Sequence, residues 1–206
     1  MAKGYREVVL DPAKKDPNHP INHGIKMQVH HLLSQQGFIK SKKDKELISY
    51  GYDINVKENL VALPNEMDAA CYLRVQVHRG NHPGFVDNND SDDDHPKSYH
   101  KHIANMLRNA TKKLEDNCST GNERTVRRYI SLYSHSVLSK ISDFEIPLTK
   151  AYKAFEKNEP GCGGETSGPA LFAKYSIGES RVCNRNVDHA KFSSFKQVPY
   201  KLEVGR

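Results

Sequence analysis

The fold is indicated by two segments, VHHLL at residues 29–33 and GYDINVKENLVALP at residues 51–64. Each contributes a short apolar run: residues 25–33 lead into a histidine pair, and residues 59–64 close at a proline. Runs of about four to eight apolar residues bounded by turn residues are typical of strands. We therefore expect two strands, the first of which ends at His30 and His31.

Helical patterns surround these strands. Short helices are expected over residues 43–50, ending at Gly51, and within residues 65–77. Apolar residues then recur at helical spacing after Lys97 and again after Asn122, which predicts two long helices packed as a hairpin. The first stripe consists of Ile103, Leu107, Ala110 and Leu114. The chain is thus predicted to be an α+β protein.

The domain organisation that we predict has three parts. Residues 1–24 form an N-terminal arm with little helix or strand, residues 25–118 form the core, and residues 119–206 form a helical and irregular extension. A chain of 206 residues is long enough for one domain with such an extension.

Composition narrows the class of protein. Hydrophobic residues make up 36% of the chain and the mean hydropathy is −0.75, so the core is small. No apolar run approaches the ~18 residues of a membrane helix, and the N-terminus lacks the apolar stretch of a signal peptide. The net charge of +6 favours a polyanionic partner. The four cysteines have no CxxC spacing, which excludes a zinc ribbon and fits free thiols in a reducing cytosol.

The polar residues of these motifs suit phosphodiester hydrolysis. A neutral imidazole can remove a proton from water near pH 7, and an asparagine amide can hold that ring in one tautomer. Histidines can also bind a divalent ion that grips a phosphate oxygen. In chain order the candidates are His30-His31, Asn55 and Asn59, the HRGNHP motif at residues 78–83, and Tyr99-His100.

This ordered pattern resembles the AHH branch of the HNH (ββα-metal) nuclease superfamily. Val29-His30-His31 stands where the branch has Ala-His-His, and the likeness covers about residues 25–115. The resemblance implies a ββα-metal core with additional packed helices. It also implies that His31 is the general base, that His30 is a metal ligand, and that Asn59 either bonds the base or braces the loop that presents it.

Several assignments of the remaining ligands stay open. His78 and His82 are four residues apart and would share one helical face, although Gly80 argues against a continuous helix there. Alternatively, His82 caps a helix and His100 supplies the ligand, while His95 competes with His82. The predicted metal ligands are His30, His78, His82 and His100, and the predicted substrate contacts are Arg79 and Tyr99.

The function expected from the resemblance is a metal-dependent DNA endonuclease that acts as an antibacterial toxin. One divalent ion is expected per site, with Mg²⁺ first and Zn²⁺, Ni²⁺ or Mn²⁺ as alternatives. The expected partners are DNA, or RNA, and a cognate immunity protein, with no membrane insertion. The protein would be cytoplasmic in the producer and delivered by a secretion system, such as type VI, into a target bacterium. The alternatives are an RNase toxin on the same scaffold and a non-catalytic, metal-stabilised nucleic-acid-binding protein.

Overall fold

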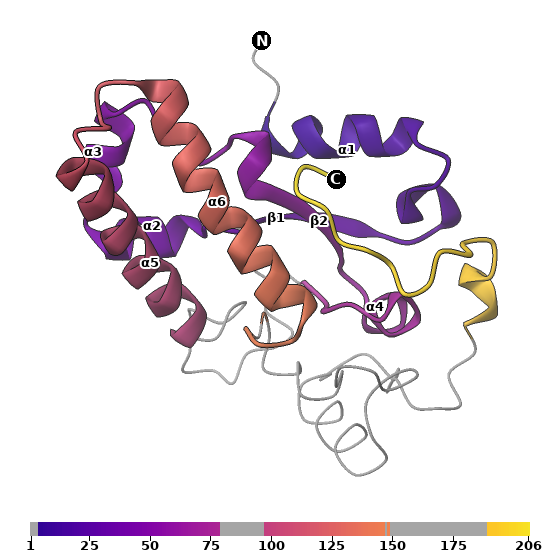
Figure 1. Cartoon of the computed structure of the whole chain (residues 1–206). Coiled ribbons are helices and arrows are strands. Elements are labelled where there is room, and N and C mark those ends of the chain that lie inside the picture. Colours follow the sequence, from indigo (N-terminus) through magenta and orange to yellow (C-terminus); the bar gives the residue numbers. More distant parts are fainter. Residues whose placement is uncertain (1–3, 79–96, 147, 149–188) are drawn as a thin grey trace.

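The computed structural model describes residues 4–78, 97–146, 148 and 189–206 (Figure 1). A two-stranded antiparallel sheet of β1 (Met27–His31) and β2 (Leu60–Pro64) lies among helices, so the predicted α+β class is confirmed. The helices are α1 (Tyr5–Lys15), α2 (Gln35–Ser41), α3 (Asp44–Ser49), α4 (Met67–Leu73), α5 (Lys97–Asp116) and α6 (Glu123–Ser142). Short 3-10 turns occupy Pro20–His23, Lys57–Asn59 and Ala190–Phe192.

The two strands pair in a regular register that sends the two histidines to opposite faces. His30 is opposite Val61 and His31 is opposite Leu60. Because side chains alternate along a strand, neighbouring residues point to different sides of the sheet. The strands are not joined by a tight turn, since α2 and α3 lie between them in the chain. The sheet is therefore assembled by tertiary packing rather than by a hairpin loop.

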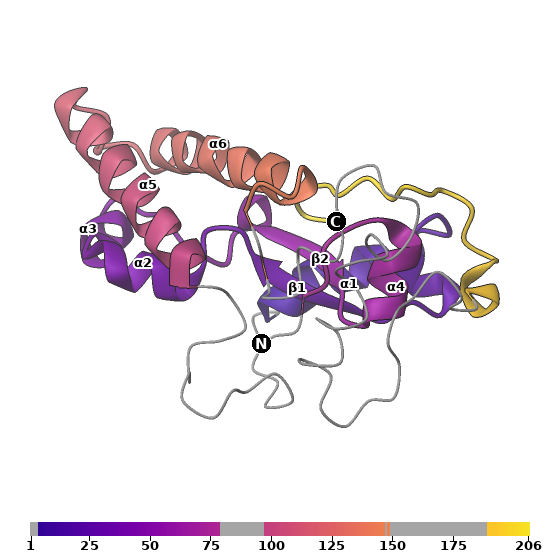
Figure 2. The same ribbon diagram turned by 90° about the horizontal axis from the view of Figure 1, so that it is seen from below.

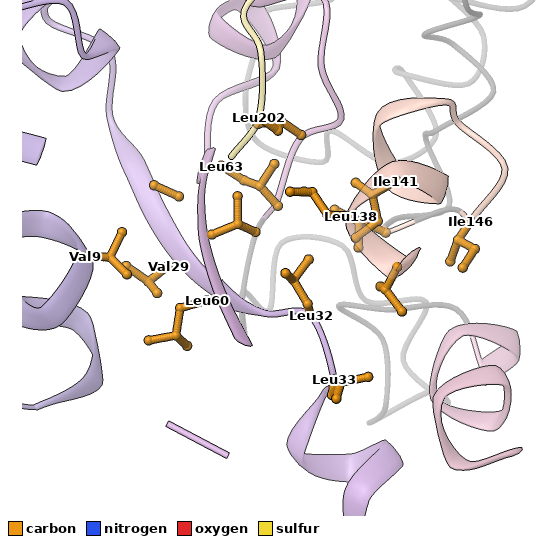
Figure 3. Packing of buried hydrophobic residues seen from close by; sticks show 14 of the residues in the cluster. Val9, Val29, Leu32, Leu33, Leu60, Leu63, Leu138, Ile141, Ile146 and Leu202 are labelled. Carbon is orange, nitrogen blue, oxygen red and sulfur yellow. The ribbon is translucent and has the colours of Figure 1, made fainter. Parts of the chain in front are cut away.

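Helices cover both faces of the sheet. Figure 3 shows Val9 of α1 beside Val29 and Leu60, all of which are buried. On the other face, Leu63 lies with Ile141 of α6. The strand ends that carry the histidines are thus held between α1 and the longer helices.

The helix α1 corrects the prediction of an arm with little helix. It runs from Tyr5 to Lys15 with Pro12 inside it, and it buries Val9 and Ala13 completely or almost so. Proline disfavours a helix interior because it lacks the N–H for the i to i−4 hydrogen bond. Burial of an apolar stripe against the sheet outweighs that cost here.

The two long helices begin and end near the predicted residues, but their packing differs from the expected hairpin. The stripe of α5 is fully buried, and Asn122 caps α6 by accepting a hydrogen bond from the Thr125 N–H. The main partner of α5 is α2, which lies beside it in both views (Figures 1 and 2). A Cβ on Gly37 of α2 would lie 2.6 Å from Ile103 Cγ2, so only glycine permits this close approach.

The C-terminal residues run along the outer side of β2 (Figure 1). The Ala62 N–H donates to the Arg206 carbonyl at 2.8 Å, and the Gly205 N–H donates to the Leu60 carbonyl at 2.6 Å. The Arg206 guanidinium also bonds the Asp16 carboxylate at 2.7 Å. This tail therefore satisfies the backbone of β2 on the side away from β1.

Two further predictions concern the cysteines and membranes. Cys118 is an exposed free thiol, but Cys71 is disulfide-bonded, so the expectation of free cysteines throughout is wrong. Among the described residues, no helix has the length and apolar character that crossing a bilayer requires.

Candidate active site

His30 and His78 lie side by side inside the protein. Their ring centroids are 4.6 Å apart with an interplanar angle of 56°, and the two residues are 2% and 5% exposed. The backbone N–H of His78 donates to the Pro64 carbonyl at 2.9 Å, which holds the segment after α4 against the end of β2. The structure therefore brings together two of the four predicted metal ligands.

His100 lies in the first turn of α5 and is also buried, with 4% of its surface exposed. Its Nδ1 is 2.9 Å from Ser34 Oγ. Ser34 is the N-cap of α2, and its hydroxyl oxygen accepts from the Gly37 N–H at 3.1 Å. The N-terminus of α2 thus orients the His100 ring, a contact that the sequence analysis did not anticipate.

His31 points to the face of the sheet that α1 covers. Its ring centroid is 4.6 Å from that of Tyr5, and its Nε2 is 3.0 Å from Asn55 Oδ1. Burial lowers the pKa of His31, while the bond to Asn55 and the charge of Asp53 oppose that shift. Because an amide oxygen only accepts, Nε2 carries the proton and Nδ1 carries the lone pair of the neutral ring. The Asp53 carboxylate accepts from the Asn55 N–H at 2.9 Å and so shapes this loop.

Asn59 makes a different set of contacts and does not bond His31. Its Oδ1 accepts from the Leu33 N–H at 2.7 Å and from the Ser134 hydroxyl at 3.1 Å. Its Nδ2 donates to the Ile54 carbonyl at 2.9 Å and to the Leu33 carbonyl at 3.2 Å. Of the two roles predicted for Asn59, the structure therefore favours bracing the loop over bonding the base.

Tyr99 has no exposed surface, which leaves it no area for direct substrate contact. Its hydroxyl donates to the Leu32 carbonyl at 2.6 Å and lies 2.9 Å from His30 Nε2. We therefore place Tyr99 behind His30 instead of against the substrate. Of the other predicted site residues, Arg79 and His82, together with the competing His95, lie outside the described residues.

The buried imidazoles suit a divalent ion by the chemistry of their donors. With metal–nitrogen bonds of about 2.0–2.1 Å, two imidazoles on one ion have ring centroids within roughly 6.5 Å of each other. His30 and His78 meet that condition at 4.6 Å. Within the part of the chain that the structure describes, no group of three or more His, Cys, Asp or Glu side chains is arranged to hold a metal. The pair accounts for two ligands of such a site.

The α+β fold, with its small antiparallel sheet packed among helices, is consistent with an HNH-like core. Residues 13–128 match the AHH family model, described as a nuclease family of the HNH/ENDO VII superfamily with conserved AHH. The match covers more than half of the chain, so the chain belongs to this family. Comparisons with curated proteins and with solved structures found no match.

Three contacts of the site were missed by sequence reasoning. Ser34 stands three residues before Gly37 at a helix start, and this capping position was the available signal. The contact of Tyr5 was missed because residues 1–24 were predicted to form an arm with little helix or strand. Asn55 was noted beside Asn59, but the sequence offers no means of deciding which of them reaches His31.

Proposed function

We propose that this protein is a metal-dependent endonuclease that cleaves DNA phosphodiester bonds. The observation that carries the proposal is the buried His30–His78 pair at the end of the sheet, in a chain of a nuclease family. His30 and His78 would hold the divalent ion, which when bound would neutralise charge on the phosphate and its leaving oxygen. RNA as the substrate is the alternative on the same site.

His31 would act as the general base of this reaction. Asn55 holds its ring so that the lone pair lies on Nδ1, and burial favours the neutral form that can accept a proton. However, the regular register places His31 and His30 on opposite faces of the sheet. The experiment therefore has to test whether one phosphate engages both residues.

The experiment is plasmid cleavage with Mg²⁺, Mn²⁺, Zn²⁺ or EDTA, with transfer RNA as a parallel substrate. We expect metal-dependent cleavage that falls by about 10²–10⁴-fold in His31→Ala and is also abolished in His30→Ala. His135→Ala removes an exposed histidine of α6 and is the matched control. Thermal melting of each variant identifies any loss of activity that results from unfolding.

The outcomes separate the alternatives. If His31→Ala folds and still cleaves while His30→Ala does not, the base lies elsewhere and the role of His31 is refuted. Cleavage of transfer RNA alone would replace DNA by RNA as the substrate. Binding without scission in every lane would favour the non-catalytic nucleic-acid-binding protein.

An exposed basic stripe on α5 supports a polyanionic substrate. Lys101, Arg108 and Lys112 are seven and four residues apart, which places them on one helix face for about 16 Å. The stripe begins one residue after His100. Arg127 of α6 is paired with the Glu58 carboxylate at 2.7 Å and is not part of this stripe. We propose that the stripe contacts the phosphate backbone near the site.

Removing the charges of the stripe should weaken DNA binding in a salt-dependent manner. Without three phosphate contacts, the slope of log affinity against log salt should be smaller by about 2–3. The test measures binding to a DNA duplex in EDTA by fluorescence anisotropy. The variant has glutamine in place of Lys101, Arg108 and Lys112. A triple variant with glutamine at Lys14, Lys15 and Lys196, exposed residues away from α5, is the control with an equal change of charge. Equal slopes in the two variants would refute a backbone contact at the stripe.

We further propose that the nuclease is an antibacterial toxin of a secretion system, acting in the cytoplasm of the target cell and neutralised by an immunity protein. The support is the resemblance to toxin nucleases. Induced expression in a bacterial host should arrest growth, and the His30→Ala variant should not. If co-expression of a small protein encoded beside this one fails to relieve the arrest, the proposed immunity partner is refuted.

A further inference from the structure

The Tyr99 hydroxyl stands between a backbone carbonyl and a site histidine. Tyr99 lies in the first turn of α5, and its oxygen is 2.6 Å from the Leu32 carbonyl oxygen and 2.9 Å from His30 Nε2. Leu32 follows directly on the histidine pair in the chain. The helix α5 is thus linked to the end of β1 by one phenol oxygen.

The number of available protons fixes the donor and the acceptor in both hydrogen bonds of the Tyr99 hydroxyl. A phenol has one hydrogen, and a carbonyl oxygen can only accept. Two oxygens 2.6 Å apart would repel each other without a hydrogen between them, so the Tyr99 proton points to Leu32. The remaining contact then requires His30 Nε2–H to donate to the Tyr99 oxygen.

We propose that Tyr99 is a positioning residue that holds neutral His30 in its Nε2–H tautomer and so makes Nδ1 the nitrogen that binds a divalent ion. The metal part of this inference rests on the proposed function, whereas the tautomer does not. Ligand histidines commonly bond a partner through their second ring nitrogen, which orients the ring and sets its tautomer.

His100 provides a contrast within the same site. Its partner is the Ser34 hydroxyl, whose oxygen already accepts from the Gly37 N–H. A serine hydroxyl can still either donate to the imidazole or accept from it. The contact with Ser34 therefore does not determine the tautomer of His100, whereas the contact with Tyr99 determines that of His30.

The test uses ¹⁵N-labelled, metal-free protein at pH 8 and two-bond ¹H–¹⁵N correlations of the His30 ring. In the wild type we expect a protonated-type signal from Nε2 and an unprotonated-type signal from Nδ1. In Tyr99→Phe, which keeps the ring and removes the oxygen, we expect a mixture of tautomers. Tyr72→Phe is the matched control, because the Tyr72 hydroxyl also donates to a backbone carbonyl, that of Phe195, at 2.6 Å.

A second readout is the affinity for Zn²⁺ alone, measured by calorimetry. We expect about 10–100-fold weaker binding in Tyr99→Phe and no change in Tyr72→Phe. An Nδ1–H tautomer in the wild type would overturn the proposal even if Tyr99→Phe failed to fold. An unchanged tautomer and Zn²⁺ affinity in a folded Tyr99→Phe would overturn it as well. The nuclease proposal can fail independently. In that case the protein would not cleave nucleic acid although His30 has the expected tautomer.

Discussion

Replacing Asn59 by alanine should mainly lower the stability of the fold, with a smaller direct effect on the rate of cleavage. The Asn59 side chain is fully buried and makes four hydrogen bonds, to Leu33, Ile54 and Ser134. At about 1 kcal/mol net for each bond, the destabilisation is about 4 kcal/mol, because the buried N–H and C=O groups are left without partners. For a chain of this size the melting temperature should fall by roughly 8–16 °C.

The measurement is urea unfolding of Asn59→Ala followed by circular dichroism, with Asn55→Ala as the control. Asn55 lies in the same loop but is not buried, so its variant should stay within about 1 kcal/mol of the wild type. Activity should show the reverse order once both variants are folded, since Asn55 holds His31. A destabilisation below about 1 kcal/mol in Asn59→Ala, together with a severe loss of cleavage, would refute the bracing role.

Other parts of the fold give further predictions. Gly37→Ala should destabilise the protein by about 1–3 kcal/mol, because its Cβ would clash with Ile103. The control is Gly121→Ala, which should be close to neutral because no atom lies within 4 Å of the new Cβ. Equal urea unfolding midpoints of the two variants would contradict the close packing of α2 on α5. Burial lowers the pKa of His19 to about 4, so the unfolded chain binds the extra proton between pH 4 and 6.5. Stability should therefore fall as the pH is lowered from 6.5 to 4, by on the order of 2 kcal/mol, and His19→Gln should lack this part of the decrease in urea titrations at several pH values.

Local signals were sufficient for most of the secondary structure. The apolar runs at residues 25–33 and 59–64 become strands, and Gly51 ends the helical region before it with a positive φ of 86°. The α5 stripe is buried as its period predicts. These features depend on residues within a few positions of one another, which is why they can be predicted from the sequence.

The site was predictable only in part. The histidine pair marks the end of β1, and alternation along a strand already implies opposite faces in a regular ladder. The choice between Asn55 and Asn59 was not accessible, because both are polar residues of one loop, four positions apart. The turn at Lys57–Asn59 directs Asn59 inward to Leu33 and leaves Asn55 to meet His31.

The amino-acid order thus determines the α+β class, the long helices, the histidine pair and the family, since these follow from local pattern and motif. Tertiary packing alone decides that α1 forms over a proline, that α5 rests on α2, and that Tyr99 lies behind His30. Each of these depends on contacts between residues distant in sequence, whose free energy exists only once the core is assembled.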